Sequence, residues 1–62
     1  MSQIEVESEG KIYRADYVLS ENVVTVFGEG GTSSTQLGGV SERTIAKMLL
    51  RNLIREGKVQ PE

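Results

Sequence analysis

Three short turn signals divide residues 1–40 into four segments in which apolar and polar side chains alternate. The signals are Glu9-Gly10, Glu21-Asn22 and Gly30-Gly31. Gly and Asn tolerate the positive φ angles of two-residue hairpin turns, so each signal predicts that the chain reverses direction there. Alternation with a period of two is typical of strands that have one buried face. The predicted strands cover approximately residues 3–8, 11–20, 23–28 and 32–37.

The three turns can be checked against one another, because residues directly opposite in an antiparallel pair lie on the same face of the sheet. The third turn, for example, places Val24 opposite Leu37. All three registers bring the apolar residues of the segments to one face, and a shift of one residue at any turn would move that strand's set to the other face. These apolar residues are Ile4, Val6, Tyr13, Ala15, Tyr17, Leu19, Val24, Val26 and Leu37.

The segment from Ser41 to Glu56 has the signals of an amphipathic helix. Ser41 is a favourable N-cap residue, and Gly57 is favourable directly after the C-cap. The stripe expected to face the sheet consists of Ile45, Met48, Leu49 and Leu53. We therefore predict one α+β domain over residues 1–62, a four-stranded antiparallel meander with this C-terminal helix packed on one face. A three-stranded sheet, with residues 32–39 as a mobile loop, is the alternative, because this segment is polar and has Gly on both sides.

The composition of the chain argues against most chemistry. It has 62 residues, with neither cysteine nor histidine. Without cysteine there is no disulfide, and without both residue types a structural zinc site is disfavoured. A serine nucleophile lacks its usual histidine base, and the Gly-rich segment 28–33 lacks the Gly-Lys-Ser/Thr of a phosphate loop. We therefore expect no enzyme activity, cofactor or metal. With no signal peptide or apolar span in the sequence, we expect a cytoplasmic protein without a membrane partner.

Two groups of apolar residues exceed what one helix can cover. One group alternates onto the sheet face away from the helix, and the other flanks the core-facing stripe of the helix. A domain of this size buries only about 60% of the surface of its unfolded chain, so a partner subunit would add stability. We predict a non-enzymatic interaction module that associates with itself, most simply as a homodimer, or with another protein. The predicted contact residues are Val18, Val23, Phe27, Leu50 and Ile54.

A row of basic residues at i, i+4 spacing follows the side of the predicted helix opposite its apolar stripe. The row consists of Arg43, Lys47, Arg51 and Arg55. Residues 1–40 carry six acidic and two basic residues, whereas residues 41–62 carry three acidic and five basic ones, so the charge is polarised along the chain. As an alternative function, the row predicts contact with the phosphates of a nucleic acid or with an acidic protein surface. A solvated helix face that keeps the protein soluble is the other interpretation.

Short motifs in residues 29–50 resemble a known family. Glu29-Gly30-Gly31, then Gly39-Val40-Ser41-Glu42-Arg43 and Leu49-Leu50, are similar to the last hairpin and helix of the seven-kilodalton crenarchaeal chromatin proteins. Those proteins are small barrels with a C-terminal helix, and they bind duplex DNA through a triple-stranded sheet. The resemblance implies a related fold at most. This chain has a net charge of −2 and no tryptophan, in contrast to the strongly basic family, so DNA binding is not implied.

Overall fold

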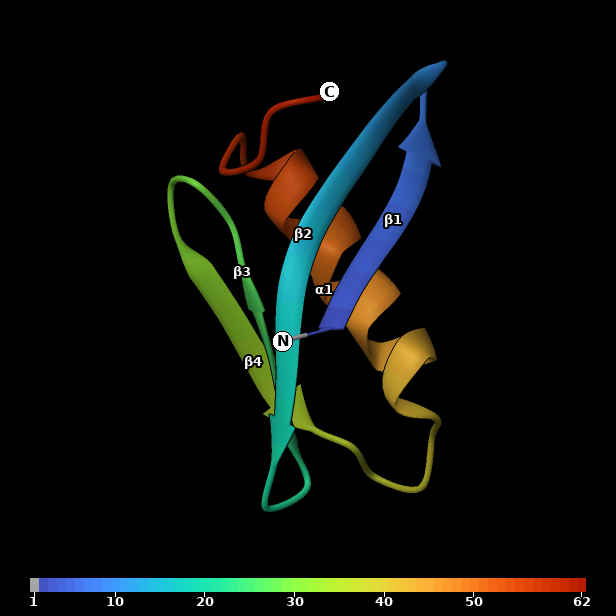
Figure 1. Ribbon diagram of the computed structural model, residues 1–62, viewed down its shortest axis with the longest axis vertical. Coiled ribbons are helices and arrows are strands. Elements are labelled where there is room, and N and C mark those ends of the chain that lie inside the picture. The colour runs from blue at the N-terminus through green and yellow to red at the C-terminus, as the bar shows by residue number, and fades with distance from the viewer. Residues whose placement is uncertain (1) are drawn as a thin grey trace.

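The structure is a computed structural model, and it describes residues 2–62 (Figure 1). Its elements are β1 (Ser2–Ser8), β2 (Lys11–Ser20), β3 (Val23–Phe27), β4 (Thr32–Gln36) and α1 (Glu42–Arg55). The strands form one antiparallel sheet in the order β1-β2-β3-β4, and α1 packs across one face of it. The predicted α+β meander with one C-terminal helix is confirmed. The three-stranded alternative is wrong, because residues 32–36 pair with β3 as a strand.

The first two hairpins have the predicted registers. Val6 pairs with Tyr13, and Leu19 pairs with Val24. Both central residues of each turn have positive φ angles, in the order Glu9 53°, Gly10 77°, Glu21 52° and Asn22 64°. This combination is a type I′ turn, whose twist matches that of the strands it joins. Glutamate is disfavoured in this region because its Cβ crowds the backbone. The apolar pairing of the strands therefore fixes these registers more than ideal turn residues do.

The third hairpin differs from the prediction by two residues. Val24 pairs with Thr35 instead of Leu37. The loop has four residues, and the N–H of Gly28 donates to the C=O of Gly31 across it at 2.8 Å. A shift of two residues keeps each side chain on its predicted face, because side chains alternate with a period of two. Leu37 therefore still packs against the core, although it lies just beyond the end of β4.

The hydrophobic core lies between α1 and the sheet face that it covers. Leu19 lies on the predicted face but is 42% exposed, at the end of β2 beside the turn. In α1 the buried stripe is rotated from the prediction, since Met48 is 45% exposed and Leu50 is fully buried. Fully buried Ala46 explains this rotation, because a small side chain lets the helix approach the sheet closely. The buried residues are Ile4, Val6, Ala15, Tyr17, Val24, Val26, Ile45, Ala46, Leu49, Leu50, Leu53 and Val59.

Residues 57–62 turn back from α1 and fill the space between the β3–β4 loop and the first half of β2 (Figure 1). The N–H of Gly57 donates to Ile54 and the N–H of Lys58 donates to Leu53, which is a Schellman motif. Among the described residues, β3 pairs with β2 only from Asp16 to Ser20, and residues 11–15 have no strand beside them on that side. The N–H of Glu62 donates to the C=O of Ile12 there, at 2.8 Å. Residues 57–62 thus lie between β2 and the β3–β4 loop, where β2 and β3 no longer pair.

Candidate functional site

The first candidate surface is the face of the sheet opposite α1. Val18, Val23 and Phe27 occupy the outward positions of β2 and β3, between residues that point into the core. Val18 pairs with Thr25, so Val23 and Phe27 are its two diagonal neighbours, at about 7–8 Å. Phe27 is 38% exposed, and the two valines are half-buried. We call these three residues the open-face patch.

The surroundings of the open-face patch are mostly uncharged. Each patch residue has a partner in a neighbouring strand, and Thr25 lies between Val23 and Phe27 on β3. Asp16, which pairs with Phe27, is the one charged residue among those paired with β3 on this face. The others paired with β3 on this face are Val18, Ser20, Thr32, Ser34 and Gln36. An apolar centre with a polar rim is the arrangement found at protein–protein interfaces.

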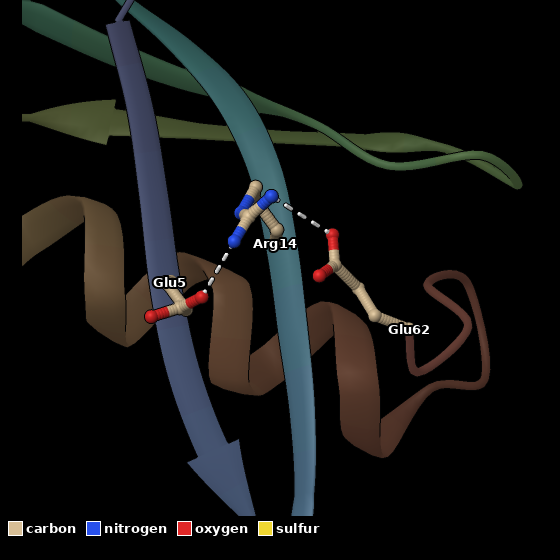
Figure 2. A network of polar contacts seen from close by, with 3 residues as sticks. All are labelled: Glu5, Arg14 and Glu62. Carbon is tan, nitrogen blue, oxygen red and sulfur yellow. Dashed lines mark hydrogen bonds and ion pairs between the residues drawn. The ribbon is translucent and has the colours of Figure 1, made fainter.

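Charged side chains at the other end of this face pair with one another (Figure 2). Arg14 Nη2 donates to Glu5 Oε2 at 2.9 Å, and Arg14 Nη1 lies 3.3 Å from Glu62 Oε2. The hydrogen bond to Glu5 and then the negative charge of Glu62 raise the pKa of Arg14. All three side chains are about half exposed, so the pairs stabilise the fold little. They hold the C-terminal residue against β2.

The two helix residues predicted to extend the contact surface do not join the open-face patch. Leu50 lies on the side of α1 that faces the sheet and is fully buried, so its predicted place at the surface is wrong. The rotation of the helix that exposes Met48 also turns Leu50 into the core. Ile54 is half-buried, packs against the core and borders a groove next to α1. The predicted contact residues are thus divided between two separate parts of the molecule.

The second candidate surface is a groove between the β1–β2 turn and the C-terminal half of α1. Its volume is about 410 Å³. Tyr13 and Ile54 pack against the core and give it an apolar wall, while Arg51 and Arg55 bring two positive charges. Among residues 2–62, no carboxylate lies within 4.0 Å of either guanidinium. The lining residues are Ser8, Glu9, Tyr13, Arg51, Ile54 and Arg55.

The predicted basic row does not form one flat surface. Each i, i+4 step advances about 40° around a helix with 3.6 residues per turn, so Arg43 and Arg55 point about 120° apart. Arg43, Arg51 and Arg55 are exposed, and Lys47 is half-buried. Arg51 and Arg55 are the two members that line the groove. Sequence reasoning missed the groove because Ser8 and Tyr13 reach it from a distant part of the chain.

Two other kinds of site are absent from the part of the chain that the structure describes. No three acidic side chains there converge in a way that would hold a metal ion. No helix within residues 2–62 has the length and apolar character needed to cross a membrane. Comparison of the chain with known protein families, curated proteins and solved structures finds no match.

Proposed function

We propose that the protein is a non-enzymatic self-association module and that it forms a homodimer through the open-face patch. The observation that supports this most is the exposure of Phe27, which is a diagonal neighbour of half-buried Val18 on the sheet face opposite the helix. Removing apolar surface from water contributes roughly 25 cal/mol per Å². Covering the patch would therefore stabilise a chain too short to bury much surface by itself.

A second copy of the same chain suits this face because the patch is complementary to itself. In a dimer with two-fold symmetry, each patch meets the same patch on the partner. Two twisted sheets pack face to face with their strands about 30° apart, which lets Phe27 of one copy insert near the valines of the other. The β4 side of the patch is polar and uncharged, so it brings no like charges together in the dimer. On the β2 side, Asp16 is the one charged residue that borders the patch.

The proposal is tested by sedimentation equilibrium on the wild type and two matched variants. Phe27 and Ile12 are both 38% exposed and both lie on the open face. Ile12 is four residues along β2 from Asp16, the partner of Phe27, which is about 13 Å at roughly 3.3 Å per residue. Phe27→Thr should weaken dimerisation by about tenfold or more, or about 1.4 kcal/mol, because it removes an apolar contact from both copies. Ile12→Thr should leave dimerisation unchanged within about twofold.

Circular dichroism of both variants serves as the folding control. A wild-type protein that stays monomeric at about 1 mM, a concentration at which even a weak dimer would form, would overturn the proposal. So would an equal loss of association in the two variants, because exposure alone and not the position of the patch would then explain the effect.

A further inference from the structure

We propose that the groove between the β1–β2 turn and α1 binds a small phosphate monoester, held by Arg51 and Arg55. This site is separate from the open-face patch and does not depend on dimerisation. It rests on three observations: the unpaired positive charges, the chemistry of the lining and the size of the groove.

The two arginines of the groove lie one helical turn apart and have no acidic partner. Residues at i and i+4 have Cβ atoms about 5–6 Å apart, so like charges at this spacing repel one another. No carboxylate of residues 2–62 lies within 4.0 Å of Arg51 or Arg55 to relieve this repulsion. A bound dianion would relieve it. Both arginines are exposed, so this repulsion is weak, and an anionic ligand held between them would replace it with attraction.

The two arginines of the groove favour a doubly charged phosphate over a singly charged carboxylate, because each guanidinium can bind either group but two positive charges favour the dianion. A guanidinium group presents paired N–H donors that match the oxygens of a phosphate, and two of them can share one terminal phosphate group. Ser8 and Tyr13 each add a hydroxyl-bearing side chain to the lining. The apolar wall of Tyr13 and Ile54 suits the organic part of the ligand. A phosphate monoester with an aromatic or aliphatic group has both of the required parts.

The size of the groove and the charge of the remaining surface favour a small ligand over a nucleic acid. The groove is about half open to solvent, and its volume of about 410 Å³ has room for a small molecule. Helix α1 carries four basic residues and one acidic residue, but the rest of the chain carries three basic and eight acidic residues. A long polyanion would meet this negative surface, whereas a small ligand meets the local positive charge.

Glu9 is the one acidic residue in the lining, so its substitution should strengthen binding where substitution of an arginine weakens it. Its negative charge opposes an anion, so Glu9→Gln should strengthen binding about two- to threefold, by removing one screened repulsion at the surface. Arg51→Gln and Arg55→Gln should each weaken binding about tenfold, since each removes charge-assisted hydrogen bonds. Arg43→Gln, which removes the same charge from the same helix outside the groove, should change it by less than about twofold.

The experiment is a titration followed by ¹⁵N–¹H correlation spectra, with phenyl phosphate, inorganic phosphate and a 12-base-pair DNA duplex as separate probes. Phenyl phosphate should give saturable shifts in residues 8–13 and 51–55, with a dissociation constant below about 10 mM. Inorganic phosphate should bind the same residues more weakly, because it lacks the group that contacts the apolar wall. Phe27→Thr should bind phenyl phosphate as the wild type does.

Three results would overturn the proposal. The first is the absence of saturable shifts with phenyl phosphate at low salt. The second is equal weakening by Arg43→Gln and Arg55→Gln, which would indicate general charge attraction. The third is preferred binding of the duplex, with equal dependence on all four basic positions. The slope of the logarithm of the binding constant against the logarithm of the salt concentration would then be about −3.6, the value for four phosphate contacts. That last result would assign the whole basic row to nucleic acid.

Discussion

The two faces of the sheet use the same strands and similar residues, but the chain closes one face and leaves the other open. On β3, Val24 and Val26 are fully buried under α1, whereas their neighbour Val23 is half-buried on the other face. Hydrophobicity of the side chain does not separate these residues. What separates them is whether another segment covers the face. The covered face therefore holds the buried core of the fold, and the open face stays in contact with solvent.

The largest effect is expected from a truncation beneath the helix. Leu50→Ala should lower the free energy of unfolding by about 3 kcal/mol, because it leaves a cavity in a fully buried part of the core. Met48→Ala, on the exposed side of the same helix, should change it by less than about 0.5 kcal/mol. Urea unfolding at one fixed protein concentration measures both. Similar losses in the two variants would contradict the observed rotation of α1.

A pair of isosteric substitutions on one strand compares the faces directly. Val26→Thr places a hydroxyl in the core with no partner and should cost about 2 kcal/mol of unfolding free energy. Val23→Thr places the same hydroxyl on the open face and should cost less than about 0.5 kcal/mol in the monomer. Thermal unfolding at low protein concentration separates the two. If Val23→Thr destabilised the monomer as much as Val26→Thr, the side chain of Val23 would have to be buried within the monomer.

The C-terminal residues extend the covered side, and their contribution is expected to be smaller. Val59 is 5% exposed, and its truncation to Ala should cost about 1–2 kcal/mol through lost burial of two methyl groups. Gln60→Ala is the matched control, because the bond from Gln60 to Glu29 Oε1 uses the backbone N–H and survives the substitution. Hydrogen exchange of the β3–β4 loop should speed up in the first variant alone.

The smallest effect is expected at the charged border of the open-face patch. Asp16 pairs with Phe27, so the proposed dimer brings this carboxylate near the interface in both copies. Asp16→Asn should tighten dimerisation about threefold, which corresponds to about 0.7 kcal/mol, by removing this charge. Sedimentation equilibrium at low salt measures the change. A weaker dimer would show that the carboxylate makes a favourable contact, contrary to the proposed arrangement.

Those parts of the fold that depend on neighbouring residues could be predicted from the sequence. Two-residue turns and alternating side chains set the registers of β1, β2 and β3 locally. The β3–β4 loop could not be predicted in this way, because it packs against residues about thirty positions later. A Cβ atom at Gly28 would lie 2.9 Å from both the C=O of Lys58 and Cγ2 of Val59. The loop length therefore follows from a tertiary contact.

The candidate surfaces likewise include a part that the sequence could predict and a part that depends on tertiary contacts. Alternation alone placed Val18, Val23 and Phe27 away from the helix, and the structure has them there. The helical period could not distinguish a buried stripe that includes Met48 from one that includes Leu50. The two residues lie at equal angles, about 100°, on either side of Leu49 around the helix. The burial of Ala46 together with Leu50 shows which stripe faces the sheet. In the groove, the signal present in the sequence was the i, i+4 pair Arg51 and Arg55, while Tyr13 joins them through the fold.

The most direct test of the proposed dimer is an isotope-filtered NOE experiment on a mixture of ¹³C-labelled and unlabelled protein. The filter records contacts between different copies and suppresses those within one copy. The dimer predicts NOEs from the Phe27 ring of one copy to the methyl groups of Val18 and Val23 in the other. Intermolecular NOEs that involve Met48 and the outer side of α1, with none from Phe27, would contradict it.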